Sequence, residues 1–157
     1  MKNELSLKTC ETELIGLGIT MAARAVSRFF NKSLKGLGVT MTQAYAMYAI
    51  SEYRGYNTGY IAKKLYIDHC VLRKCIESIK KYVEIHKDSS DKRATYPALT
   101  QEGAIFLRKI MPKLIEFEQG IGHITQNKDF FINFIHTFST KMVRSKIGFK
   151  MEMFDGN

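Results

Sequence analysis

Seven polar side chains recur between Asp68 and Lys81 at spacings that would place them along one face of a helix. They are His69, Cys70, Arg73, Lys74, Glu77, Lys80 and Lys81. At about 100° of rotation per residue, the apolar residues gather on the opposite face: Val71, Leu72, Cys75, Ile76 and Ile79. Long cationic side chains on such a face can reach phosphates and guanine edges, and shorter groups can read neighbouring bases. The pattern is typical of a helix that enters a DNA major groove, although a charged face that meets only solvent is the alternative.

A second group lies in the segment SSDKRATYPALTQEG, residues 89–103. Asp91, Lys92 and Arg93 would stand at the tip of a predicted hairpin. The negative potential of a minor groove attracts a guanidinium such as that of Arg93. Asp91 can accept hydrogen bonds from Arg93 or from the turn backbone and so orient the arginine. The alternative is a surface ion pair of negligible energy.

The elements that must position these residues follow from hydrophobic periodicity and cap residues. The sequence predicts helices over 11–35, from Thr42 to Glu52, from Thr58, over 68–81, from Thr100 with a kink at Pro112, and over 128–145, with strands over 83–87 and 94–99. Thr42, Thr58 and Asp68 are expected to cap the helices that they begin. Tyr60, Lys63 and Lys64 would lie on the exposed face of the short helix from Thr58. Two short helices, a hairpin and a long helix are the order of a winged helix-turn-helix. The expected fold is mainly α with a two-stranded β wing.

Composition narrows the classes of function. Lysine and arginine exceed aspartate and glutamate by 24 to 15 among 157 residues, a net charge of +9, which favours a polyanionic partner. Three cysteines without a CxxC pair and four scattered histidines predict neither a disulfide framework nor a metal site. No nucleotide fingerprint or catalytic grouping stands out, so we expect no cofactor and no enzymatic activity. The apolar segment 14–23 follows Glu4, Glu11 and Glu13, unlike a signal peptide, which predicts a cytoplasmic protein with no membrane partner.

The wing segment resembles that of MarR-type transcriptional regulators, in which an Asp-x-Arg turn precedes a strand ending in Leu-Thr-x-x-Gly. The segments GLGVTMTQAYAMYAI (36–50) and TGYIAKKLYIDHCVLRKCIESI (58–79) are similar to the family's first-to-second helix region and its helix-turn-helix. The match covers roughly 28–119. It implies a homodimer with intertwined terminal helices, two recognition helices in successive major grooves, and two wings in the flanking minor grooves. His69 and Cys70 stand where the family commonly has small hydroxyl residues.

We therefore predict one winged-helix domain over 1–157, with a DNA-binding core over 36–99 that holds a helix-turn-helix (58–81) and a wing (83–99). The ranges 11–35 and 100–145 would form the dimerisation helices, the last of them rich in phenylalanine. The predicted DNA-contacting residues are Thr58, Tyr60, Lys63, Lys64, His69, Cys70, Arg73, Lys74, Glu77, Lys92 and Arg93, with Asp91 supporting the wing.

The predicted function is sequence-specific binding of double-stranded DNA by a transcriptional regulator. The alternative is a winged-helix module that binds an acidic protein partner. The sequence identifies neither the operator, the target genes, the direction of regulation nor an effector, whether a small molecule or an oxidant.

Overall fold

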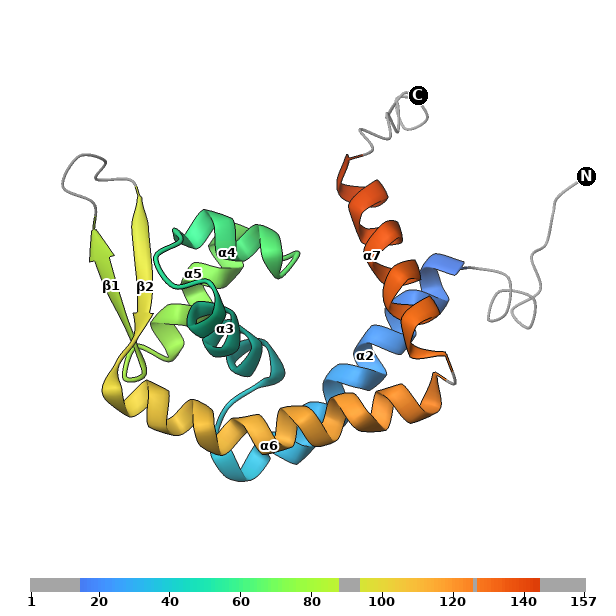
Figure 1. The fold of residues 1–157 in the computed structure, drawn as a ribbon, viewed down its shortest axis with the longest axis horizontal. Coiled ribbons are helices and arrows are strands. Elements are labelled where there is room, and N and C mark those ends of the chain that lie inside the picture. The colour runs from blue at the N-terminus through green and yellow to red at the C-terminus, as the bar shows by residue number, and fades with distance from the viewer. Residues whose placement is uncertain (1–14, 88–93, 126, 145–157) are drawn as a thin grey trace, which may run out of the picture. The chain divides into compact units, whose positions relative to one another are not determined.

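The computed structural model describes residues 15–87, 94–125 and 127–144. The wing tip with Asp91, Lys92 and Arg93 lies outside the described residues, as does the start of the first predicted helix. Figure 1 shows the described helices and the one hairpin. The elements are α2 (Ile15–Leu34), the 3-10 turn η1 (Lys35–Leu37), α3 (Met41–Glu52), α4 (Thr58–Lys64), α5 (His69–Ser78), β1 (Val83–Lys87), β2 (Thr95–Leu99), α6 (Gln101–Ile124) and α7 (Lys128–Arg144). Internal contacts divide the chain into two units, residues 1–113 and 114–157.

The core of the first unit is formed where helices of the helix-turn-helix meet α2, α3 and the start of α6. Its fully buried side chains, each less than 2% exposed, are Phe30, Leu34, Met47, Ile50, Ile61, Leu72 and Ile110. Each large aliphatic or aromatic side chain removed from water contributes about 1.5–3 kcal/mol to the stability of the fold. The core therefore holds the short helices α4 and α5, which are too short to be stable alone in water.

Three side-chain caps fix where the helices of this unit begin. Thr40, and not the predicted Thr42, caps α3, because its extended backbone allows a capping box in which Gln43 and Thr40 each bind the other's backbone N–H. Asn57, and not the predicted Thr58, caps α4 by accepting a hydrogen bond from the backbone N–H of Tyr60 at 2.9 Å. Asp68 caps α5 as predicted and accepts from the backbone N–H of Cys70 at 2.8 Å.

The recognition segment ends earlier than its hydrophobic pattern predicts. The sequence predicts a helix to residue 81, whereas α5 ends at Ser78 and Ile79 turns the chain. The backbone N–H of Tyr82 then donates to the carbonyl of Ile79 at 2.8 Å, a tight turn that leads Val83 into the hairpin. The pairing of the two strands thus overrides the helical pattern of residues 79–81, because Val83 must align with Leu99.

The hairpin pairs β1 and β2 antiparallel, with Val83 opposite Leu99 and Lys87 opposite Thr95. The predicted strands match the observed ones except that β2 begins at Thr95 rather than at 94. Pro97 lies opposite Ile85 and has no N–H for the ladder. A two-stranded sheet tolerates this proline because each of its strands has a free edge.

The junction between the hairpin and α6 explains the Leu-Thr-x-x-Gly motif. Thr100 donates its backbone N–H to the carbonyl of Tyr82 at 3.0 Å, and its hydroxyl accepts from the backbone N–H of Gly103 at 3.0 Å. A Cβ at position 103 would overlap the carbonyl oxygen of Tyr82. Glycine is therefore required where the first turn of α6 crosses the backbone that leads into β1.

The helix α6 continues through Pro112, and the boundary between the two units follows at 113 and 114. In the second unit, Asn127 caps α7 by accepting from the backbone N–H of Phe130 at 3.0 Å. The helix is described as far as Arg144, and the predicted last residue, Ser145, lies outside the described residues. Phe134 and Phe138 stack at 6.0 Å between ring centroids, and the side chain of Phe134 is 44% exposed. The phenylalanine-rich pattern thus gives a helix with an exposed aromatic face.

Candidate nucleic-acid interface

The predicted two-sided character of α5 is present in the structure. Its inner face buries Leu72, Cys75, Ile76 and the following Ile79. Its outer face exposes five of the predicted DNA-contacting residues: His69, Cys70, Arg73, Lys74 and Glu77. Val71 was predicted to belong to the inner face, but this is wrong, since it is 47% exposed. It lies at the flank of the helix, about 100° before Leu72, beyond the stripe that the core covers.

An open cleft of about 520 Å³ separates α5 from the hairpin. Cationic side chains line it, Arg73 and Lys74 from α5 and Lys87 from the end of β1. The carboxylate of Glu77 shares this cleft with the three cations. Sequence reasoning missed Lys87, although strand alternation places it on the same face as Ile85, another lining residue. The arrangement is net positive and open, which suits a phosphate backbone.

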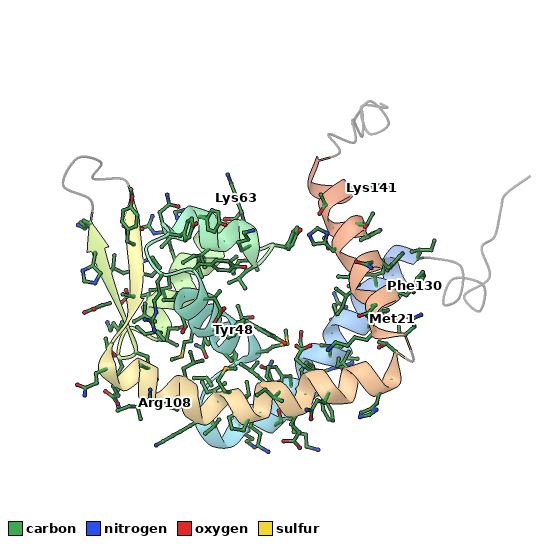
Figure 2. The ribbon with its side chains drawn as sticks, viewed as in Figure 1. Met21, Tyr48, Lys63, Arg108, Phe130 and Lys141 are labelled. Atoms are coloured by element: carbon green, nitrogen blue, oxygen red, sulfur yellow. The ribbon has the colours of Figure 1, made fainter. Side chains whose placement is uncertain are left out.

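The lysines of α4 lie at its exposed end. Lys63 projects outward from the helix (Figure 2), and Lys64 is also exposed. The ammonium of Lys64 lies 5.4 Å from the ring centroid of Tyr60, within range of a cation–π contact. Tyr60 in turn stacks on Tyr56 with ring centroids 4.1 Å apart. Tyr60 is only half-buried and keeps part of its ring accessible.

The tyrosine cluster is a feature that the sequence analysis did not assign. Tyr53 makes edge-on contacts with Tyr56 and Tyr60 at centroid distances of 6.4 and 5.7 Å. The tyrosines at 53, 56 and 60 are spaced as neighbours on one face of a helix, and this spacing was visible in the sequence. The glycine at 55 indicates a turn instead, so the spacing alone did not predict that the three rings meet. The cluster fixes the start of α4 and thus the position of Lys64.

Thr58 requires a correction. It was predicted to contact DNA, but the residue is only 3% exposed, so little of its surface is available to a ligand. Its hydroxyl lies 2.8 Å from Nε2 of His69 and 2.9 Å from Oγ1 of Thr95. Periodicity could not reveal this, because the partners lie 11 and 37 residues away in sequence.

The two lysines that follow α5 in the sequence each form an ion pair. Lys80 lies 3.1 Å from Glu77, and Lys81 lies 2.6 Å from Glu102 at the start of α6. The hydrogen bond to Glu102 raises the pKa of the Lys81 ammonium. Lys81 therefore joins the α5–β1 connection to α6, and both lysines lie beyond the end of α5 rather than on its outer face.

The two described cysteines differ in environment. Cys75 is buried on the inner face of α5, and burial raises the pKa of its thiol. Cys70 is exposed on the outer face and lines the cleft beside Arg73. A raised thiol pKa keeps Cys75 protonated and unreactive near neutral pH.

No family model matches the sequence, and no protein with a curated description matches it. Many solved structures do match the fold. The M. tuberculosis transcriptional regulator MOSR in complex with DNA has a TM-score of 0.77 and 18% identity, covering 86% of this chain and 100% of that chain. The S. aureus MepR–DNA complex has a TM-score of 0.66 and 19% identity, covering 82% of this chain and 96% of that chain. Wild-type MarR from E. coli has a TM-score of 0.58 and 20% identity, covering 80% of this chain and 94% of that chain.

The chain has the MarR-type winged-helix fold. In this fold α4 and α5 form the helix-turn-helix, and the β1–β2 hairpin forms the wing. The predicted fold, mainly α with a two-stranded wing, is confirmed, whereas the intertwined dimer stays a prediction. Between residues 15 and 144, no described helix is long and apolar enough to cross a membrane.

Proposed function

We propose that this protein is a cytoplasmic transcriptional regulator that binds double-stranded DNA sequence-specifically as a homodimer. The exposed face of α5 carries the proposal, because its hydrogen-bonding side chains stand on a helix that the core holds from behind. In a winged helix-turn-helix this second helix enters the major groove, where each base pair presents a distinct set of donors and acceptors. The DNA complexes of MOSR and MepR, which have the same fold, support this docking mode.

Each group of side chains has a proposed role. Arg73 reads base edges or anchors the register, because a guanidinium can bind guanine with two hydrogen bonds. Lys63, Lys64 and Lys87 bind phosphates on either side of α5. Lys92 and Arg93, at the wing tip, reach a phosphate and the minor groove, and Asp91 orients Arg93. The net charge of +9 favours the approach of the protein to DNA.

The homodimer is proposed from the apolar face of α7. Phe130 is 68% exposed and Phe134 is 44% exposed, which leaves aromatic surface for a second copy of the chain. A two-fold dimer would present two copies of α5 to half-sites about 34–36 Å apart, one turn of DNA. The expected operator is therefore a palindrome with half-sites centred about 10 base pairs apart.

A titration with duplex DNA at several salt concentrations tests the proposal. DNA binding should weaken linearly on a logarithmic salt scale, with a slope of about −0.9 for each phosphate neutralised. A module for an acidic protein partner would instead show little duplex affinity. Selection from a random duplex pool then yields the operator. If no duplex is bound at low salt, the proposed function is wrong.

A further inference from the structure

Among the residues that the structure describes, Thr58 is the one polar residue that is buried. Its hydroxyl contacts side chains from two other elements. Thr58 begins α4, His69 begins α5, and Thr95 begins β2, opposite Lys87 at the end of the paired strands farthest from α6 in the chain. The hydroxyl oxygen of Thr58 lies 2.8 Å from Nε2 of His69 and 2.9 Å from Oγ1 of Thr95. A buried hydroxyl without such partners would cost free energy, so the two contacts hold the three elements in one relative position.

The contact also determines which edge of the His69 ring is available to a ligand. His69 is exposed on the outer face of α5, yet its Nε2 is engaged with Thr58. The Nδ1 edge is therefore the one left to meet a base. An unrestrained histidine side chain could present either nitrogen and would lose more conformational entropy on binding.

The hydrogen-bonding direction follows from the protonation of the ring. When the Thr58 hydroxyl donates to Nε2, the proton of the neutral ring lies on Nδ1. When the ring is cationic, both nitrogens carry protons, and Thr58 accepts from Nε2 and donates to Thr95. In both of these states Nδ1–H is a donor, as a contact with guanine requires. Guanine presents two acceptors, N7 and O6, in the major groove.

We infer that Thr58 is a positioning residue that fixes His69 so that its Nδ1–H reads a guanine at one position of the operator. Base selectivity at that position then depends on a hydroxyl that does not touch DNA. The inference rests on the proposed function, and it concerns His69, which stands where the family commonly has a small hydroxyl residue early in this helix.

The experiment compares four variants in full-length protein on the duplex that selection yields: Thr58→Val, Thr58→Ser, His69→Ala and the double variant Thr58→Val/His69→Ala. Competition with duplexes that carry single base-pair changes measures the preference at each position. Valine has nearly the shape of threonine but no hydroxyl, whereas serine keeps the hydroxyl. Unfolding curves select an assay temperature at which every variant is folded.

We expect Thr58→Val and His69→Ala to lower the preference for guanine at the same position by about tenfold, or about 1.4 kcal/mol. Thr58→Ser should keep most of the preference, and the double variant should lose no more than His69→Ala alone. Thr58→Val should lower affinity for the selected duplex by more than it lowers affinity for nonspecific duplex. Nitrogen-15 NMR of the histidine rings in free protein should show a change at His69 Nε2 in Thr58→Val but little change in Thr58→Ser.

The outcomes separate this inference from the function on which it rests. If wild-type protein binds no duplex, both fail. If wild-type protein binds and Thr58→Val keeps the wild-type preference, or lowers affinity equally for all duplexes, the positioning role is overturned and DNA binding stands. If Thr58→Val does not fold, His69→Ala remains decisive, because an unchanged preference in that surface variant also overturns the inference.

Discussion

The exposed faces of α5 and α7 have the same helical spacing but opposite chemistry. The face of α5 carries charged and hydrogen-bonding groups such as Arg73 and Lys74, which water solvates well. The face of α7 carries Phe130, Phe134 and Ile135, and Ile135 is 42% exposed. Apolar surface of this kind gains free energy when another apolar surface covers it. The difference indicates two kinds of partner, a polyanion for α5 and a protein surface for α7.

The largest expected effect comes from a substitution on the apolar face of α7. Phe134→Lys should convert a dimer into monomers, because burial of a phenylalanine is worth about 1.5–3 kcal/mol and a two-fold interface contains it twice. The dissociation constant should rise by about 100-fold or more. Analytical ultracentrifugation over a micromolar concentration series measures it. His136→Lys is the matched control, since this exposed position lies about 200° around α7 from Phe134 and should leave the dimer intact. A dimer of unchanged affinity in Phe134→Lys would contradict the assignment.

A second substitution destabilises the fold that holds α5 in place and leaves the exposed face of α5 unchanged. Gly103→Ala places a Cβ against the carbonyl oxygen of Tyr82, where backbone must shift, and should cost about 1–3 kcal/mol of unfolding free energy. Gly120 lies in the same helix with nothing within 4 Å of an added Cβ. Gly120→Ala should therefore stabilise the protein by about 0.5–1 kcal/mol. Urea unfolding of both variants measures the two signs, and equal effects would rule out the close approach as the reason for Gly103.

The fold was largely predictable from the sequence, and particular residues show where prediction stopped. Asp68 caps α5 as its type and place predict. The cap positions Thr42 and Thr58 were each wrong by one or two residues, because Thr40 and Asn57 are equally good caps and only tertiary packing decides between them. The end of α5 was wrong by three residues, since the pairing of Val83 with Leu99 is nonlocal.

The candidate site was predictable where exposure follows periodicity. Arg73, Lys74 and Glu77 are exposed as the helical wheel requires. Thr58 was not predictable, because its burial depends on contacts with residues 69 and 95 that spacing does not encode. Lys87 was missed because it joins the site through the hairpin rather than through α5. The roles of Lys92, Arg93 and Asp91 lie outside the described residues and stay predictions.

A third substitution tests the polar face of α5. Arg73→Ala should lower the affinity for the selected duplex by about 1–3 kcal/mol and relax its sequence preference. Lys63→Ala should instead lower affinity about equally on all sequences and reduce the salt slope by about one, as expected of a phosphate contact. Fluorescence anisotropy at several salt concentrations separates the two patterns. Unchanged affinity and preference in Arg73→Ala would show that α5 is not the recognition helix.

The smallest expected effect uses the two cysteines that lie on opposite faces of α5. In a Cys10→Ser background, an alkylating reagent at pH 7 should modify the exposed Cys70 quickly and Cys75 slowly. The pKa of Cys75 is raised by burial, so its thiolate fraction is small at neutral pH. Its modification should accelerate as the pH rises toward that pKa. Mass spectrometry of time points measures both rates, and equal rates at pH 7 would contradict the two-sided structure of the helix.

Alkylation of Cys70 then tests whether its part of α5 meets DNA. In a Cys10→Ser, Cys75→Ala background, modification adds bulk to a side chain that lines the cleft beside Arg73. Because a buried interface cannot absorb that bulk without losing contacts, affinity for the selected duplex should fall at least tenfold, or about 1.4 kcal/mol. The same reagent applied to Cys70→Ser protein should change nothing, which excludes damage elsewhere. If the alkylated protein keeps its affinity, the start of the α5 face lies outside the DNA interface, and recognition must come from residues nearer Arg73 and the wing.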